Sequence, residues 1–359
     1  MKRILCFICV FLIIVTPLTG CSGQANKNET TAQPGADTAT ENASSEAAES
    51  SIKTAGSAIS SESLTHRTDS ADAPVVYFSS DISAKGLVRL YNALNWAPTG
   101  KVAVKVSTGE SNNSNYLRPE LIKELVQELD GTIAECMTAY GGNRSTPESH
   151  HQIAEEHGFT AIAPFDLMDE DGEIEIPFTG GDRLDKVYVG SHIDQYKNVL
   201  VLSHFKGHAM AGYGGALKNI AIGMSSVSGK ILIHSGGKRT EGSIMSADQD
   251  AFLEALAEAS KAITGYVGNE NMIYISVMNR LSVDCDCDAN PAEPDMHDIG
   301  ILASTDPVAL DQACIDFVYS APDSSSLTER IESQNGVHTL EHAEKIGLGS
   351  RQYQLRIIE

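Results

Sequence analysis

The stretch that decides the fold is Asn198-Val-Leu-Val-Leu-Ser203, which continues as His204-Phe-Lys-Gly-His208 and, three residues later, as Gly212-Tyr-Gly-Gly-Ala-Leu-Lys-Asn219. The apolar run predicts a buried strand, because it is short and carries no charge. The glycine-rich segment predicts a tight turn that leads into a helix over 216–224. A strand, a turn and a helix in this order are typical of an α/β fold.

The same alternation continues through the rest of the chain from about residue 73. Apolar runs at 74–79, 101–107, 132–136, 271–278 and 298–303 predict strands. Helical patterns cover 85–94, 119–129 and 247–264, and another helix begins at Asp306-Pro307. We therefore expect an α/β domain over 73–359, with a largely parallel or mixed sheet, helices on both faces and two lobes, about 73–200 and 201–359.

The N-terminus predicts export and a lipid anchor. Met1-Lys2-Arg3 is a short basic segment, residues 4–17 are apolar but too few to span a bilayer, and Leu18-Thr-Gly-Cys21 follows as a bacterial lipobox. Residues 1–20 are therefore expected to be a lipoprotein signal peptide, and Cys21 to carry the diacylglyceryl lipid, a palmitate-type modification. The protein would then be lipid-anchored to the bacterial cell membrane on its extracytoplasmic face. A plain secretory signal cleaved nearby is the alternative, and it also places the protein outside the cytoplasm.

Composition separates a tether from the folded domain and excludes one class of partner. Residues 21–72 are rich in Ser, Thr, Ala, Glu and Asn with almost no large apolar residue, so they are expected to form a disordered tether between the lipid and the domain. The 359-residue chain has a formal net charge of −22. Nucleic acid is therefore not an expected partner, because binding phosphates requires a basic surface.

Histidines and lysines concentrate in the stretch from Ser203 to His234. If a helix begins after Gly214-Gly215, Lys218 lies in its first turns, where the helix dipole and loss of solvent lower the pKa of an amine. His208 and His234 suit proton transfer or metal ligation. Three interpretations stay open: a structural turn, a glycine-rich site for an anion or substrate, and a catalytic or cofactor site.

Three further loops carry polar side chains that we expect to join the same site, because ligands gather at the carboxyl ends of parallel strands. Two follow predicted strands, one with Gly109 and Glu110 and one with Asn143. The third is Asp284-Cys-Asp-Cys-Asp288. Cys285 and Cys287 are candidates there for metal ligands or for a redox function. Disulfides to distant cysteines or an inert acidic loop are the alternatives, since a Cys-x-Cys pair rarely closes on itself.

Several segments in order resemble the DUF362 family of uncharacterised bacterial and archaeal proteins. They are Asn115-Tyr-Leu-Arg-Pro-Glu-Leu121, Tyr140-Gly-Gly-Asn-Arg144, Ser203-His-Phe-Lys-Gly-His208, Gly212-Tyr-Gly-Gly-Ala-Leu-Lys-Asn219 and the stretch 298–309. Many members carry a ferredoxin-like insert after the segment that ends here at His234. Residues 235–263 contain no cysteine, so an iron–sulfur cluster is not expected.

A more distant similarity concerns the nickel-pincer lactate racemase family. Lys218 follows His208 by ten residues and His234 follows Lys218 by sixteen, as in that family. The resemblance implies that His208 transfers a proton, that Lys218 holds a cofactor covalently and that His234 binds metal. The His-Arg-Pro motif of that family is replaced by Leu117-Arg118-Pro119, which leaves Arg118 as a candidate carboxylate clamp.

The sequence thus predicts a metal- or cofactor-dependent enzyme that acts on a small anionic metabolite, with the metal, the reaction and the substrate open. Export by the general secretory route weakens the nickel assignment, because the chain would cross the membrane unfolded. A non-catalytic lipoprotein that binds a metal or a small ligand is the alternative. The enzyme predicts turnover that depends on Lys218, and the binding protein predicts stabilisation by a ligand without turnover.

Overall fold

An eight-stranded sheet runs through the computed structural model, which describes residues 51–244 and 248–359. Its strands are β3 (Val75–Ser79), β4 (Val102–Lys105), β5 (Thr132–Glu135), β6 (Phe165–Leu167), β9 (Asn198–His204), β12 (Met272–Met278), β13 (Gly300–Ser304) and β14 (Gln354–Ile357). They lie in the order β14-β3-β13-β12-β9-β4-β5-β6. Within the described chain, β13 alone runs against the other strands of this sheet. The predicted α/β class with a mixed sheet is confirmed.

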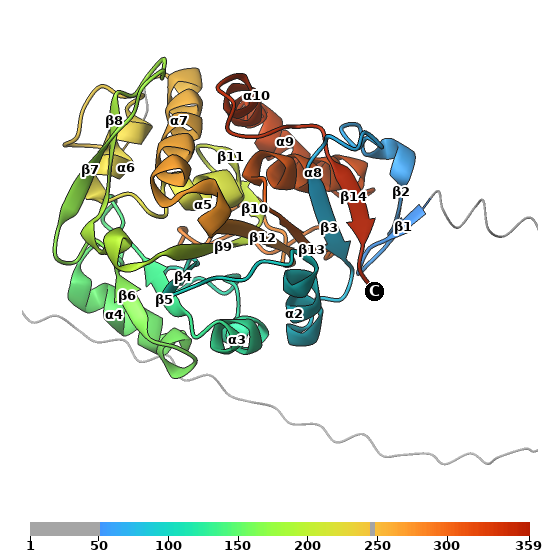
Figure 1. Cartoon of the computed structure of the whole chain (residues 1–359), viewed down its shortest axis with the longest axis horizontal. Coiled ribbons are helices and arrows are strands. Elements are labelled where there is room, and N and C mark those ends of the chain that lie inside the picture. The colour runs from blue at the N-terminus through green and yellow to red at the C-terminus, as the bar shows by residue number, and fades with distance from the viewer. Residues whose placement is uncertain (1–50, 245–247) are drawn as a thin grey trace, which may run out of the picture. The chain divides into compact units, whose positions relative to one another are not determined.

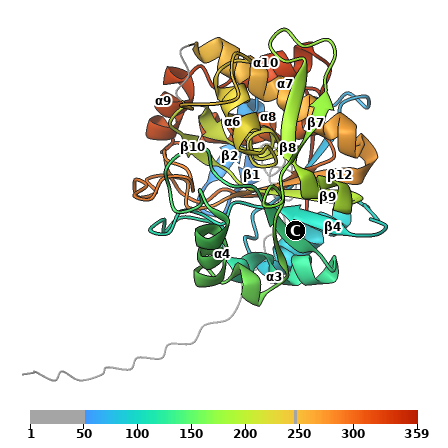
Figure 2. The same ribbon diagram turned by 90° about the vertical axis from the view of Figure 1, so that its left-hand side faces the viewer.

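Helices cover both faces of the sheet (Figure 1). One face packs against α2 (Ala84–Ala93) and α3 (Pro119–Glu128), and α4 (Pro147–Glu156) packs beside β6. The other face carries α5 (Ala216–Ala221), α6 (Val227–His234), α7 (Gln249–Val267), α8 (Pro307–Ser320), α9 (Ser325–Ser333) and α10 (His338–Lys345). The turned view agrees, with α3 and α4 on one side of the sheet and α6, α7 and α10 on the other (Figure 2).

Along the central strands, side chains point alternately to the two faces of the sheet, and this decides which face carries Lys105. Val102 and Val104 of β4 pack in the core beneath α2 and α3, whereas Ala103 packs in the core on the opposite face. Because side chains in a strand alternate between faces, Lys105 points to the same side as Ala103. A lysine is thereby placed at the carboxyl end of a buried strand, on the face that carries α5.

The predicted boundary between lobes near residue 200 falls inside this sheet. Strand β9 pairs in parallel with β4 on one side and with β12 on the other. All described residues also belong to one contact unit. The sheet is therefore continuous across the position where the sequence suggested a division.

The predicted tether is corrected over its last part, because residues 51–72 fold onto the domain. Strand β1 (Ser51–Lys53) pairs with β2 (Ala58–Ser60), and Ile52, Ile59 and Leu64 are buried. The Thr68 amide donates to the Tyr353 carbonyl over 2.8 Å. Three widely spaced apolar side chains are enough to fix this segment, and they are too few to stand out in a composition. The signal peptide, Cys21 and the rest of the tether lie outside the described residues.

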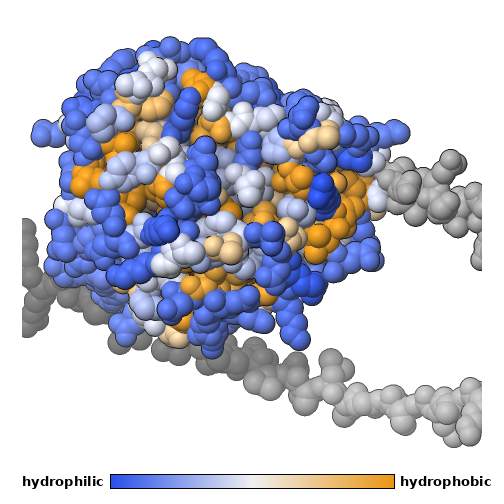
Figure 3. All heavy atoms as spheres, in the orientation of Figure 1, coloured by the Kyte–Doolittle hydropathy of each residue, from blue (hydrophilic) through white to orange (hydrophobic). Residues whose placement is uncertain are grey.

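Two further small hairpins lie outside the eight-stranded sheet. Strand β7 (Glu173–Pro177) pairs with β8 (Lys186–Gly190), and β10 (Lys206–His208) pairs with β11 (Gly212–Gly214). The face in Figure 3 is mostly hydrophilic, with apolar residues in separate patches. Among the described helices, none has the length and apolar character needed to cross a bilayer.

The folded state of residues 51–72 can be tested with one buried and one exposed isoleucine. Ile59→Ala should lower the free energy of unfolding by about 2–5 kcal/mol, because it leaves a cavity beneath the β1–β2 hairpin. Ile357→Ala is the control, since Ile357 is 51% exposed, and it should change stability little. Urea denaturation of the mature chain measures both. Equal, small effects would show that residues 51–72 do not belong to the folded domain.

Candidate functional site

A cavity of about 240 Å³ lies at the carboxyl ends of β4, β5 and β9, where open α/β sheets bind ligands. Within the described chain, its cationic lining consists of Lys105, Arg144, Lys206, Lys218 and Lys230. Its carboxylate lining consists of Glu135 and Asp286. A protein with a formal net charge of −22 therefore encloses a cavity of the opposite sign. Such a cavity favours an anionic ligand.

The glycine-rich turn is held by an internal carboxylate. Asp311 of α8 accepts hydrogen bonds from the backbone N–H groups of Ala216 and Leu217, at 2.7 and 2.9 Å. A Cβ atom at Gly215 would lie 2.3 Å from Asp311 Oδ1, so glycine is needed for this close approach. The first amides of α5 are thus already bonded. Gly214 and Gly215 line the cavity. The amides of Ala216 and Leu217, however, are bonded to Asp311 and are not available to an external anion.

Lys218 lies in the first turn of α5 and differs from the other lysines of the cavity in its contacts. Its ammonium makes no hydrogen bond or ion pair within the described chain, whereas Lys105 and Lys230 donate to backbone carbonyls and Lys206 pairs with Asp286. Burial, and then repulsion from the Lys206 ammonium, lower the pKa of Lys218 to about 7. A large fraction of this amine is therefore neutral near pH 7, and a neutral amine can act as a nucleophile or a base.

Asp286 holds the cations on one wall. Its Oδ2 accepts from Lys206 Nζ at 2.8 Å, and its Oδ1 lies 3.0 Å from His204 Nδ1. Burial acts to raise the pKa of Asp286, but Lys206 and His204 outweigh it and hold that pKa well below its usual range. The other ring nitrogen of His204 donates to the Asn279 carbonyl over 2.7 Å. His204 is therefore a structural histidine that fixes the Asp286 loop.

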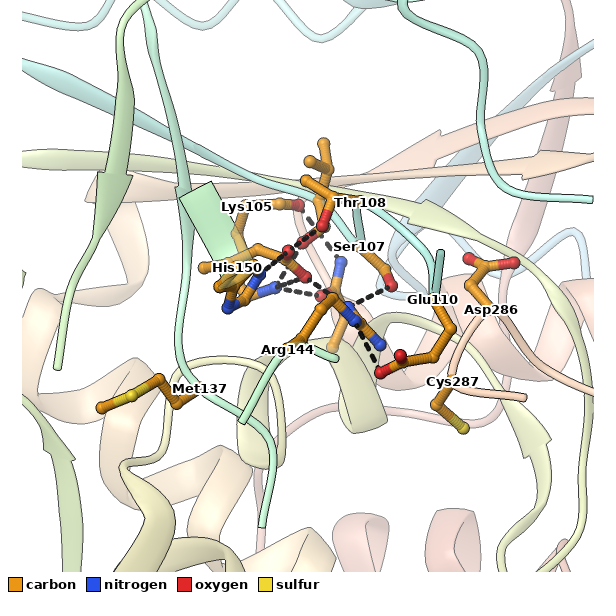
Figure 4. Close-up of polar contacts among 12 residues, drawn as sticks. Lys105, Ser107, Thr108, Glu110, Met137, Arg144, His150, Asp286 and Cys287 are labelled. Carbon is orange, nitrogen blue, oxygen red and sulfur yellow. Dashed lines mark hydrogen bonds and ion pairs between the residues drawn. The ribbon is translucent and has the colours of Figure 1, made fainter. Parts of the chain in front are cut away.

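Glu135 lines another part of the cavity. Figure 4 shows the side chains of Thr108, Arg144 and His150, which surround one point close to the end of β5. One of the Glu135 oxygens accepts from Arg144 Nη1 at 3.2 Å, and the other accepts from Thr108 at 2.5 Å and lies 2.8 Å from His150 Nε2. Burial also lowers the pKa of nearby Lys105, to about 8, although Glu135 opposes that shift. Every oxygen of this buried carboxylate is bonded, so Arg144 is fixed with its guanidinium at the cavity.

Glu110, which is predicted together with Asn143 to bind a cofactor, lies against Arg144. Glu110 accepts from Arg144 Nε at 3.2 Å and from the Asn143 amide at 3.0 Å. Gly109 precedes it with a φ of +79°, which favours glycine. Arg118 is not brought to the cavity: its guanidinium lies 4.2 Å from the centre of the Tyr116 ring and donates to the Ser114 carbonyl.

The two histidines of the cavity differ at Nε2, which is a hydrogen-bond donor in His208 and an acceptor in His234. His208 Nδ1 accepts from the Ala211 amide at 2.9 Å, so the neutral ring carries its proton on Nε2 and offers a donor. His234 Nδ1 lies 2.7 Å from the Lys230 carbonyl, so it donates and leaves an Nε2 lone pair. Burial lowers the pKa of His234 to about 4 and lowers that of His208 well below its usual value. Both rings are therefore neutral at pH 7, and His234 is the one with a lone pair for a metal or a proton.

The Cys285 and Cys287 sulfur atoms form a disulfide with each other, although the sequence favoured other interpretations because such a pair rarely closes on itself. The turn brings their Cα atoms to 5.2 Å, which is within the normal range for a disulfide. In this form neither cysteine offers the thiolate expected of a metal ligand. Their sulfur atoms and a His208 nitrogen lie within 4.8 Å of one another.

The structure brings His208, Lys218, His234, Cys285 and Cys287 to one cavity. Of the residues that set the charge of this cavity, Arg144, Lys206, Lys230 and Asp286 lie in segments that the sequence indicated, although it gave them no individual role. Sequence reasoning missed Lys105 and Glu135, which lie in predicted strands. One signal was available: Lys105 ends an otherwise apolar strand, where a lysine is costly unless it has a function.

A family model described as "Domain of unknown function (DUF362)" matches residues 102–316, more than half of the chain. No curated protein matches. Among solved structures, the lactate racemase apoprotein from Thermoanaerobacterium thermosaccharolyticum is similar, with 14% identity, a TM-score of 0.42, and 76% of this chain and 62% of that chain covered. A Thermotoga maritima protein has 10% identity and a TM-score of 0.36, with 73% and 58% covered. The chain spans about three fifths of the length of each.

The importance of Asp286 for the cavity can be tested by an isosteric change. Asp286→Asn should lower the free energy of unfolding by about 3–5 kcal/mol, because it leaves the buried Lys206 ammonium without its counter-charge. Asp323→Asn is the matched control, since Asp323 pairs with His297 at the surface, and it should cost far less. Guanidinium denaturation at pH 7 compares them. Equal losses would show that the Lys206 pair contributes no more than a surface pair.

Proposed function

The chain belongs to the DUF362 family, and on that premise we propose that its domain is an enzyme that acts on a small anionic metabolite through the amine of Lys218. The observation that carries the proposal is an unpaired lysine, with a pKa of about 7, in a cavity lined by four other cations. Those cations would neutralise a carboxylate or phosphate group. Lys218 would then meet the reacting part of the ligand as a neutral amine.

The two histidines divide the remaining chemistry between them. His208, with its proton on Nε2, would donate a hydrogen bond to a ligand oxygen as negative charge develops there. His234 would accept a proton through its free Nε2. The sequence resemblance gave proton transfer to His208, whereas in this proposal His234 acts as the base.

A metal or a metal-containing cofactor fits one part of this donor set. If a metal binds, Lys218 and His234 would hold it in place of the reacting-amine and base roles given to them above, since one is a neutral amine and the other has a free lone pair. A bound metal would supply Lewis-acid chemistry. The disulfide between Cys285 and Cys287 offers no thiolate in its oxidised form, so these cysteines are not part of the proposed metal site.

We also propose that the enzyme is a lipoprotein held at the extracytoplasmic face of the bacterial cell membrane through Cys21. The proposal rests on the basic start, the short apolar segment and the lipobox that ends at Cys21. An attached lipid would keep the domain close to the bilayer by a tether that ends near residue 51.

The enzymatic proposal predicts turnover that depends on Lys218. Mixtures of short carboxylates and phosphates should show conversion by NMR, and Lys218→Met should slow it by about 100-fold or more. Lys345→Met is the control, because Lys345 is exposed. The rate should rise as pH increases through about 7, since protonation removes the neutral amine. Undiminished turnover in Lys218→Met would contradict the proposal, and thermal stabilisation by an anion without turnover would favour the binding protein.

The anchor predicts that Cys21→Ala moves the protein out of the membrane. Labelled palmitate should enter the wild-type chain in bacterial cells, and the variant should lose the label and its membrane association. Cys9→Ala, which changes a cysteine of the signal segment, is the control and should still be labelled. Labelling that persists in Cys21→Ala would contradict the assignment.

A further inference from the structure

The Cys285–Cys287 disulfide lies between two cavities. Both cysteines line the cavity of about 240 Å³ with Lys218, and both line a neighbouring cavity of about 380 Å³ that also contacts Glu110, Tyr140 and Ala209. Cys285 is 4% exposed, whereas Cys287 is half-buried. One sulfur atom is thus more accessible from outside than the other.

We propose that this disulfide is a redox-active site that exchanges with external thiols, with Cys287 as the attacked sulfur and Cys285 as the leaving thiolate. A thiolate attacks Cys287 Sγ, the bond between the two sulfurs breaks, and its electron pair passes to Cys285. A second external thiolate then attacks the mixed disulfide and releases Cys287 as a thiolate. Two external thiols are oxidised to one disulfide, and the two protein thiolates take up protons from water.

The surroundings favour Cys285 as the leaving group. Its sulfur accepts a hydrogen bond from the Cys287 amide at 3.2 Å, and a His208 nitrogen lies within 4.8 Å of both sulfurs. The cavity behind it carries the Lys206 ammonium. Backbone donors and nearby cations stabilise a thiolate, and a stabilised thiolate leaves faster.

The loop is held independently of the disulfide. The intervening Asp286 pairs with Lys206 at 2.8 Å, and its carbonyl accepts from the Glu110 amide at 2.9 Å. Asn113 Nδ2 donates to the carbonyls of Cys285 and Asp288, at 3.3 and 2.8 Å. After reduction, these contacts would keep the two thiols adjacent, which reversible closure requires.

The other described cysteines lack these features and serve as internal controls. Cys136 also lines the inner cavity, but its S–H donates to the Met224 carbonyl at 3.4 Å and burial raises its pKa. Cys314 is fully buried in α8, and burial raises its pKa well above the usual value. A thiol with a raised pKa exchanges slowly near neutral pH.

A soft metal held by the two reduced cysteines and His208 is the competing use of the same side chains. The hydrogen bonds at His208 Nδ1 place the ring proton on Nε2, where a metal would need a lone pair. This arrangement favours thiol exchange. The inference does not rest on the proposed enzymatic activity, because exchange can be measured without a metabolite.

The test uses the folded mature chain, glutathione and peptide mapping by mass spectrometry. In the wild type, reduced glutathione should release two thiols that map to Cys285 and Cys287, while Cys136 and Cys314 stay unmodified. With oxidised glutathione, Cys285→Ser should form a mixed disulfide at Cys287 at least about tenfold faster than Cys287→Ser does at Cys285. Circular dichroism checks that both variants are folded, and the wild-type measurement needs no substitution.

Three results would overturn the proposal. The first is a wild-type disulfide that glutathione reduces only after denaturation. The second is equal reactivity of the two single-cysteine variants, or faster reaction at Cys285. The third is stoichiometric zinc retained by the reduced wild-type chain with its two thiols protected from alkylation, which would assign the pair to a metal site.

Discussion

The structure depends on the burial of more positive than negative charge around one cavity. Removing a charge from water is costly unless it is paired, and the carboxylates that line the cavity, Glu135 and Asp286, cannot pair with every cation there. Asp286 forms an ion pair with Lys206, and Glu135 forms one with Arg144. Lys218 has no such partner, so its pKa falls to about 7 and much of its charge is lost. The imbalance thus creates both a preference for anions and a neutral amine.

Several parts of the fold position the charged side chains around the cavity. The strand period turns Lys105 toward the cavity at the end of β4, and the close contact of Gly215 with Asp311 sets the start of α5 and the direction of Lys218. The Asp286 loop links the hairpin that carries Lys206 to the cysteine pair. A redox change at the cysteines would therefore occur beside the groups that fix the charge of the cavity.

The fold and part of the site could be predicted from sequence because their signals are local. Buried strands and helix starts follow from short patterns, and the spacing of His208, Lys218 and His234 lies within one stretch. The Arg144–Glu110 and Lys206–Asp286 pairs join segments 34 and 80 residues apart, so no local pattern indicates them. Ile52 and Ile59 pack in the core of the domain, a long-range contact that the composition of residues 51–72 does not reveal. The closed Cys285–Cys287 pair depends on a turn held by Asn113 and Asp286, which only the tertiary structure shows.

The most direct test of this account is an NMR titration of Lys218 in the mature chain with lysines labelled with ¹³C at the ε carbon, using Lys218→Arg to assign the signal. The account predicts a titration midpoint of about 7 for this amine, whereas exposed lysines should titrate near their ordinary value of about 10.4. A midpoint near that ordinary value would mean that Lys218 is paired or solvated, and it would contradict the central claim.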